Sequence, residues 1–146
     1  MHTKTATTAI TVNIIIDAPV QKVWDSWTVP AHIVHWNNAS PDWHTPRAEN
    51  DLRVGGKFLS RMEARDGSMG FDFSGEYTKI QQHKLIELTL DDNRKVRVRF
   101  DADGHKTKVT EVFEAENQNA VELQQSGWQA ILDNFKKYVE ASEKEK

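Results

Sequence analysis

Apolar side chains in the last long segment of the chain, residues 119–141, recur at intervals of three and four residues. This spacing places them on one face of an amphipathic helix: Trp128, Ile131, Leu132, Phe135, Tyr138 and Val139. Asn119 and Glu122 have the spacing of an N-terminal capping box. Gly127 lies inside the helix, where we expect its backbone to pack closely on a sheet. Three aromatic rings on one face indicate that the rest of the chain forms a broad concave surface that receives this helix.

Between residues 55 and 113 the apolar period changes to two, which is typical of strands with one buried face. The strands that this alternation predicts are 57–62, 71–77, 85–90, 95–100 and 107–113. Asp66-Gly67 and Asp103-Gly104 are turn signals between them. Gly75 is expected to bend or bulge its strand.

The N-terminal part of the chain predicts a strand over residues 10–16, followed by two short helices that end near residues 28 and 36. Residues 37–53 show no sustained periodicity and are interpreted as a long functional loop. The fold class is therefore α+β: about six antiparallel strands curve around the long C-terminal helix, and two short helices follow the first strand. Such a sheet leaves a cavity beneath the helix. Residues 1–146 make one domain, with an ordered core over about residues 10–141.

Composition narrows the classes of function. The chain has no cysteine, which excludes disulfides, thiolate metal ligands and cysteine nucleophiles. The first nine residues are polar and Thr-rich, without the apolar stretch of a secretory signal, so a cytoplasmic location is expected. No apolar run is long enough to span a membrane. The net charge of −3 argues against nucleic-acid binding, and the basic residues 94–99 are interpreted as a solvated strand face.

Several short motifs occur in a specific order along the chain: Ala18-Pro19, Val23-Trp24, Trp27-Thr28, Pro30, Trp36, Asp51-Leu52-Arg53-Val54-Gly55-Gly56, Gly75, Tyr77 and Gly127-Trp128. Together they resemble the START-like (SRPBCC, helix-grip) superfamily, in the branch named for homology to the activator of heat-shock protein 90 ATPase. The resemblance extends over residues 10–139. It implies a single domain with a ligand-accessible cavity under the long helix. Members of the superfamily are assigned to lipid or polyketide binding, polyketide cyclisation, self-sacrifice resistance and chaperone contact.

The expected function is the binding of a small apolar or aromatic molecule, lipid-like or polyketide-like, between the sheet and the helix. The residues expected to line the site are apolar or aromatic: Trp36, Trp43, Phe58, Met62, Phe73, Tyr77, Val98, Trp128, Leu132 and Phe135. Two alternatives stay open: an enzyme of the cyclase or hydrolase type acting on such a ligand, and an interaction module that contacts a chaperone.

The enzyme alternative depends on three candidate acid–base residues. Asp42 and His44 lie in the polar segment 37–53, where a carboxylate can orient a histidine, but Asx-turns and a solvated lid explain the same residues. Glu111 shares strand parity with Val109, so it faces the interior if that parity is the buried one. Glu87 raises the same question on another strand, and the sequence leaves both orientations open.

No metal site and no cofactor are expected. His32 and His35 could share a helix face, and His44 follows in the next segment, with Asp42 and Glu49 as further ligand candidates, but their spacing does not impose a coordination geometry. A chaperone contact is not expected either, since the chain lacks the additional segment that such activators carry in the family. The oligomeric state, monomer or homodimer, is left open.

Overall fold

The computed structural model describes residues 8–144. Residues 1–7, which bear on the expected absence of a secretory signal, and residues 145–146 lie outside this range. In chain order the elements are β1 (Ala9–Ile16), α1 (Val20–Thr28), α2 (Pro30–Trp36), β2 (Trp43–Asn50), β3 (Lys57–Ala64), β4 (Gly70–Gln81), β5 (Leu85–Leu90), β6 (Lys95–Asp103), β7 (Lys106–Glu114) and α3 (Val121–Lys144). None of the helices in this range is long and apolar enough to cross a lipid bilayer.

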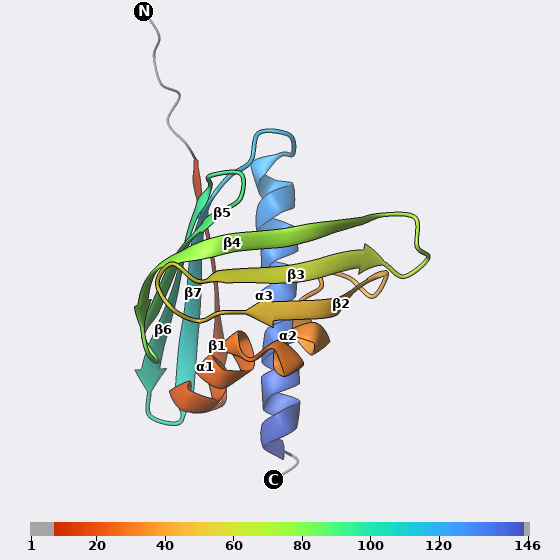
Figure 1. Ribbon diagram of the computed structural model, residues 1–146. Helices are drawn as coiled ribbons and strands as arrows, with labels where there is room; N and C mark the ends of the chain where they lie inside the picture. Colours follow the sequence, from red (N-terminus) through yellow and green to blue (C-terminus); the bar gives the residue numbers. More distant parts are fainter. Residues whose placement is uncertain (1–7, 145–146) are drawn as a thin grey trace, which may run out of the picture.

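Seven antiparallel strands form one sheet, in the order β1-β7-β6-β5-β4-β3-β2. The sheet curls around α3 as a half-barrel (Figure 1). The sheet has one strand more than the six expected, because the segment interpreted as a loop, residues 37–53, contains the edge strand β2. The pairing of β2 with β3 shifts register between His44 and Arg47, next to Pro46. A proline and a β-bulge interrupt the alternation by which a strand is recognised in a sequence.

The two short helices connect opposite edges of the sheet. They confirm the predicted layout: Pro19 directly precedes α1, and Pro30 is the first residue of α2, where a proline has no helical hydrogen bond to lose. Since β1 and β2 lie at opposite edges, α1 and α2 carry the chain across the open side of the half-barrel, and α2 packs against β2. The strands β2 to β7 then return as a meander until β7 pairs with β1.

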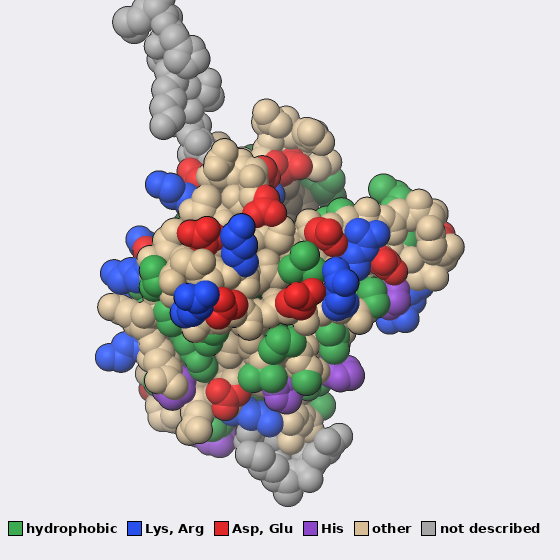
Figure 2. All heavy atoms as spheres, in the orientation of Figure 1, with side chains coloured by type: hydrophobic (Ala, Val, Ile, Leu, Met, Phe, Trp, Pro, Cys, Tyr) green, Lys and Arg blue, Asp and Glu red, His purple; other side chains and the backbone are tan. Residues whose placement is uncertain are grey.

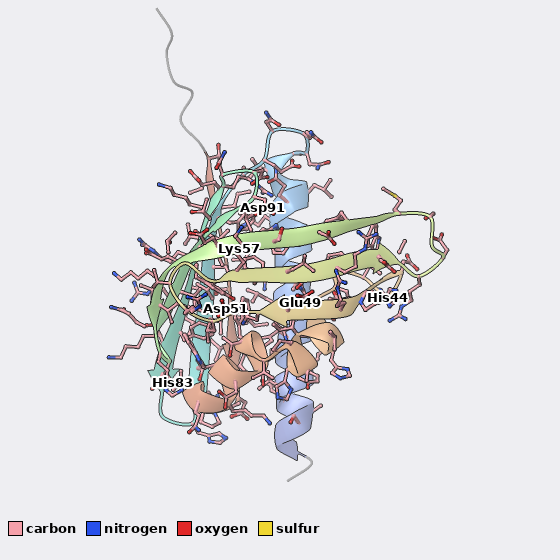
Figure 3. All side chains as sticks on the ribbon, viewed as in Figure 1. His44, Glu49, Asp51, Lys57, His83 and Asp91 are labelled. Atoms are coloured by element: carbon pink, nitrogen blue, oxygen red, sulfur yellow. The ribbon has the colours of Figure 1, made fainter. Side chains whose placement is uncertain are left out.

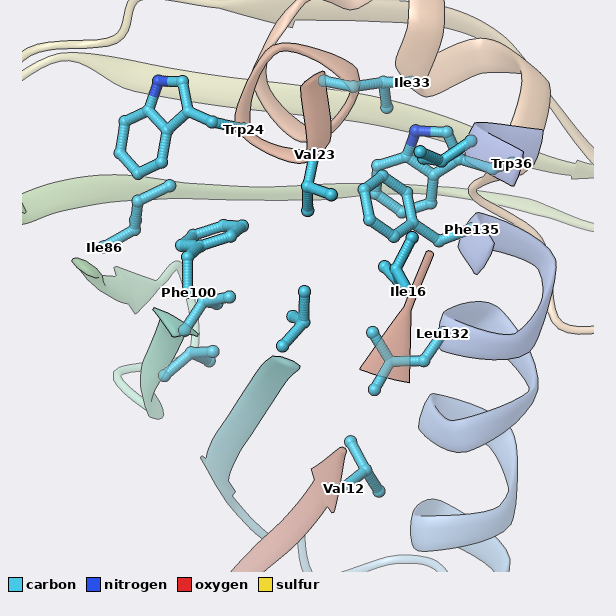
Figure 4. Close-up of a cluster of buried hydrophobic side chains, with 14 of the residues drawn as sticks. Val12, Ile16, Val23, Trp24, Ile33, Trp36, Ile86, Phe100, Leu132 and Phe135 are labelled. Atoms are coloured by element: carbon cyan, nitrogen blue, oxygen red, sulfur yellow. The ribbon is translucent and has the colours of Figure 1, made fainter. Parts of the chain in front are cut away.

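The helix α3 lies on the concave face of the sheet and fills only part of it. Leu132, Phe135 and Val139 are fully buried. Leu132 and Phe135 project from α3 toward Val12, Ile16 and the rings above them in a tightly packed core (Figure 4). Phe135 contacts the indoles of Trp27 and Trp36 edge-on, with ring centroids 5.0 and 4.8 Å apart. This end of the space under α3 is therefore solid.

The start of α3 differs from the expected capping box. The N–H groups of Leu123 and Gln124 donate to the carbonyl oxygen of Ala120, so the helix begins one residue later than Asn119 would place it. The backbone N–H and the side-chain amide of Asn119 instead donate to the carboxylate of Glu116, at 2.6 and 3.1 Å. Asn119 is therefore a donor to the loop before the helix and not the acceptor that caps its first turn.

Two glycines have the opposite roles to those expected. A Cβ atom on Gly75 would lie 2.6 Å from the carbonyl oxygen of Thr89 and 3.1 Å from the Cα of Leu90. Gly75 is therefore needed for close strand packing, whereas the register shift in β4 occurs between Tyr77 and Lys79. Gly127 was expected to pack against the sheet, but a Cβ there would meet no atom within 4 Å. The flank of α3 at Gly127 faces open space.

This contrast predicts opposite effects of the same substitution. Gly127→Ala should raise the free energy of unfolding by about 0.5–1 kcal/mol, since alanine has the higher helix propensity and meets no obstacle. Gly75→Ala should lower it by about 1–3 kcal/mol, since backbone atoms would have to move. Urea unfolding of both variants measures the difference, and shifts of the same sign would contradict this account of the two positions.

Candidate functional site

A cavity of about 350 Å³ lies between the flank of α3 and the inner face of the sheet. Its volume is within the range of pockets that hold small organic molecules, about 300–1,000 Å³. Apolar and aromatic side chains form most of its wall: Trp27, Ile33, Trp36, Phe58, Met62, Phe71, Phe73, Tyr77, Leu88, Val96, Val98, Trp128 and Ile131. Asn37, Glu49, Ser60, Arg94, Glu111, Glu116, Asn119 and Gln124 supply the polar part.

Seven of the ten expected lining residues border this cavity: Trp36, Phe58, Met62, Phe73, Tyr77, Val98 and Trp128. Leu132 and Phe135 do not, because they point from α3 into the solid core. Trp43 lies on β2, where its ring contacts Phe71 at a centroid distance of 5.9 Å, outside the lining. Whether the seven residues bind a ligand stays a prediction.

Aromatic rings form a continuous wall from β7 to β4. The indole of Trp128 stacks on Phe113 with a centroid distance of 3.8 Å and an interplanar angle of 10°. Trp128 and Phe73 make an edge-to-face contact with a centroid distance of 6.1 Å, and Phe58 contacts both Phe73 and Tyr77 at centroid distances of 5.7 Å. These contacts hold α3 at a fixed height above the sheet, so the space beside Trp128 stays open.

The side chains of α3 that border the cavity are Gln124, Trp128 and Ile131. They lie four and three residues apart on one flank of the helix. Sequence reasoning placed Ile131 on the buried stripe but did not assign it to the cavity. It also missed Trp27, Ser60 and Leu88, although the inward parity of Phe58 and Met62 could have identified Ser60 between them.

Most polar groups around the cavity are engaged with one another. The Tyr77 hydroxyl donates to Asn50 Oδ1 at 2.5 Å, and Asn50 Nδ2 donates to the carbonyl oxygen of Thr28 at 2.6 Å. Burial raises the pKa of the Tyr77 hydroxyl above its ordinary value, so it stays a neutral donor. Asn37 Nδ2 donates to Ser60 Oγ at 3.2 Å. These contacts connect β4, β2, α1 and β3 around the rim.

Glu111 is the exception. Its Cα is paired with Val12 of β1 and with Val98 of β6, which fixes its side chain on the inner face with Val109 and Phe113. The residue is 6% exposed and borders the cavity. Burial alone raises the pKa of the Glu111 carboxyl group to about 8. The orientation that the sequence left open is therefore inward, and the acid is mainly protonated at neutral pH.

Glu87 takes the other orientation. Its carboxylate accepts a hydrogen bond from Arg97 at 2.8 Å on the outer face of the sheet. Ion pairs of this kind also cover the outer face of the strands β2 to β4, where Lys and Arg side chains alternate with Asp and Glu (Figure 2). Such exposed pairs contribute little to stability. Arg94 was expected on a solvated strand face with the other basic residues of 94–99. It instead borders the cavity and pairs with Asp92 at 2.7 Å.

The other acid–base candidates do not meet at the cavity. His44 lies near the outer end of β2, away from the sheet centre (Figure 3), with Nε2 3.9 Å from a carboxylate oxygen of Glu63. Asp42 is exposed, and its carbonyl accepts the N–H of Arg65. His32 Nδ1 is hydrogen-bonded to the hydroxyl of Tyr138 at 2.5 Å. Within residues 8–144 no three His, Asp or Glu side chains are grouped closely enough to hold a metal ion.

A curved antiparallel sheet that grips a long C-terminal helix over a cavity defines a helix-grip protein of the START-like superfamily. The sequence pattern of the family described as Activator of Hsp90 ATPase homolog 1-like protein matches residues 17–140, and the chain belongs to this family. No curated protein matches it.

Solved structures agree with this assignment. The chain is 44% identical to an AHSA1-like protein of Aeromonas hydrophila, with a TM-score of 0.87 and coverage of 92% of this chain and 94% of the other. A protein of Cytophaga hutchinsonii is 50% identical, with a TM-score of 0.79 and the same coverage. A protein of Nitrosomonas europaea shares only 17% identity but has a TM-score of 0.79, over 92% and 96% of the two chains. That last similarity shows the fold alone.

The buried acid predicts how stability depends on pH. The folded chain retains the Glu111 proton up to about pH 8, whereas the unfolded chain loses it near the ordinary pKa of 4.5. Between these values the folded state binds more protons, so the Glu111 contribution falls as pH rises, by up to about 1.4 kcal/mol per unit. Glu111→Gln should remove this slope. Urea unfolding of both proteins at pH 5.5, 7 and 8.5 measures it, and parallel profiles would contradict a buried, protonated acid.

Proposed function

We propose that this protein binds a small, largely apolar or aromatic molecule in the cavity between α3 and the sheet. The observation that supports this most directly is a cavity of about 350 Å³ with a mostly aromatic and aliphatic wall. Protein interiors are close-packed and rarely keep voids much larger than a water molecule. An apolar space of this size, beside a core as solid as that around Leu132, is therefore best explained by an occupant.

The side chains that line the cavity favour binding over catalysis. Among the described lining residues, Ser60 is the only hydroxyl nucleophile apart from Tyr77, and its partner is the amide of Asn37 rather than a base. A nucleophile needs an adjacent base, and a general acid needs a second group to complete the reaction. An acid–base step by Glu111 on a bound ligand is the second candidate. The cytoplasmic location, the oligomeric state and the absence of a chaperone contact stay predictions.

A neutral fluorescent probe tests the proposal. N-phenyl-1-naphthylamine should bind the wild type with a stoichiometry of one and with enhanced, blue-shifted emission. Ile131→Trp should weaken this binding at least about tenfold, because the larger ring enters the cavity from the flank of α3 and removes space that the probe needs. Fluorescence titration measures the affinity, and circular dichroism verifies that the variant is folded.

A matched control places the same ring on the solvent side of the same helix. Lys137 is exposed, so Lys137→Trp should bind the probe as the wild type does. If the wild type binds no probe, or if both tryptophan variants bind it equally well, this cavity is not a ligand site.

A second variant distinguishes the cavity from the core. Leu132 is 0% exposed and does not border the cavity, so Leu132→Phe should overpack its surroundings and lower the free energy of unfolding by about 1–3 kcal/mol. Ile131→Trp should have a smaller effect on stability, because its ring has empty space to enter. Urea unfolding of the two variants compares them, and equal destabilisation would indicate that the region beside Ile131 is as solid as the core.

A further inference from the structure

Glu111 is held in an apolar part of the wall with no partner for its carboxyl group. The side chains beside it on the inner face are Val12, Val98, Val109 and Phe113. Among the described residues no hydrogen bond or ion pair satisfies it, although the cavity reaches it. Leaving a buried polar group unpaired costs about 1–3 kcal/mol, so a group of this kind is expected to meet a partner that enters the cavity.

Within residues 8–144 no charged group is placed to be that partner. The residues of β1 and β6 paired with Glu111 are Val12 and Val98, and the α3 side chains that border the same cavity are Trp128, Ile131 and the neutral amide of Gln124. The other titratable groups of the wall are Glu49, Tyr77, Arg94 and Glu116. All four are engaged elsewhere: the Tyr77 hydroxyl donates to Asn50, Arg94 pairs with Asp92, Glu116 accepts the N–H groups of its own loop, and Glu49 pairs with Arg47 at 3.5 Å. Glu49 carries the same charge sign as an ionised Glu111.

We propose that Glu111 is the polar anchor of the cavity, and that its carboxyl group donates a hydrogen bond to an uncharged apolar or aromatic ligand through a carbonyl oxygen of that ligand. This inference rests on the proposed ligand-binding function and names the class of ligand. A protonated carboxyl group donates one hydrogen bond while an ionised one only accepts. The apolar neighbours of Glu111 favour the protonated form.

The same surroundings disfavour charged ligands. An anionic ligand such as a fatty acid would need a free cation, and Arg94, the only Lys or Arg among the described lining residues, is already paired with Asp92. A cationic amine would require Glu111 to ionise between Val12 and Val98, and the desolvation of such a buried pair consumes much of its attraction. A neutral acceptor forms its hydrogen bond without either cost.

The test uses three naphthalene probes of similar size. Prodan, 6-propionyl-2-(dimethylamino)naphthalene, is neutral and carries a ketone. N-phenyl-1-naphthylamine lacks a carbonyl, and 2-(1-naphthyl)ethylamine is cationic. Each is titrated against the wild type, Glu111→Gln and Glu111→Leu at pH 7 and pH 9. Gln keeps a neutral donor, whereas Leu keeps the approximate volume and removes it. Circular dichroism verifies folding under each condition.

The wild type should bind prodan about tenfold more weakly at pH 9 than at pH 7, since the protonated fraction of a group with a pKa of about 8 falls about tenfold over that interval. Glu111→Gln should bind prodan at both pH values without this loss. Glu111→Leu should bind it about tenfold more weakly than the wild type at pH 7, as the loss of one buried hydrogen bond predicts. N-phenyl-1-naphthylamine should be insensitive to pH and to both variants.

Three results would overturn the inference. If prodan binds Glu111→Leu as tightly as the wild type while N-phenyl-1-naphthylamine also binds, the cavity takes ligands but Glu111 is not their anchor. If 2-(1-naphthyl)ethylamine binds more tightly than prodan and loses its affinity in Glu111→Gln, the anchor is an ion pair with an amine. If none of the probes binds any of the three proteins, the proposed function itself fails, and the inference fails with it.

Discussion

The attachment of α3 to the edge strand β1 determines the rest of this structure. Side chains on one flank of the helix, Gln125, Gln129 and Lys136, donate to the carbonyl oxygens of Thr11, Asn13 and Ile15, at 3.2, 3.1 and 2.8 Å. These carbonyls belong to alternate residues of an edge strand and therefore point away from the sheet, where no further strand pairs with them. The helix thus supplies hydrogen-bond donors to carbonyl oxygens that no strand pairs with. These hydrogen bonds in turn fix the position and the rotation of the helix. Leu132 and Phe135 then pack into the core between them.

A cavity follows from this one-sided attachment. Because α3 is held along β1, its opposite flank stands away from the long strands β3 and β4, which cross in front of it (Figure 1). The indole of Trp128 is stacked on Phe113 and prevents a closer approach of α3 to the sheet. On the open flank, Ile131 borders the cavity beside Trp128, and a Cβ at Gly127 would meet no atom within 4 Å, so α3 leaves part of this space unfilled. The same helix therefore makes a solid core on one side and an apolar pocket on the other.

Periodicity predicted most of the fold, and it failed where a local feature opposed the pattern. The strands β3 to β7 and the two short helices lie within a few residues of their expected positions, because each has one consistently buried face. The strand β2 was not predicted, because Pro46 and the bulge beside it interrupt the alternation of apolar and polar residues. The start of α3 was misplaced because Asn119 donates to Glu116 in the loop, and the first helical hydrogen bonds are accepted by Ala120. Tertiary hydrogen bonds and register shifts do not produce a periodic pattern of apolar residues in the sequence.

The limits of prediction at the site have a more specific cause. The apolar stripe of α3 contacts both the core and the cavity, and its period does not say which residues meet the core and which border the cavity. That division depends on the rotation set by the hydrogen bonds to β1, so Leu132 was expected in the wall and Ile131 was not. The orientation of Glu111 depended in the same way on pairing with Val12 and Val98, which no property of β7 alone reveals. Once that register places an acid in an apolar wall, however, its chemistry is strongly constrained. The apolar neighbours of Glu111 disfavour its ionised form. An unpaired carboxyl group buried in this wall lowers the stability of the empty protein, and the same group would select a neutral hydrogen-bond acceptor as ligand.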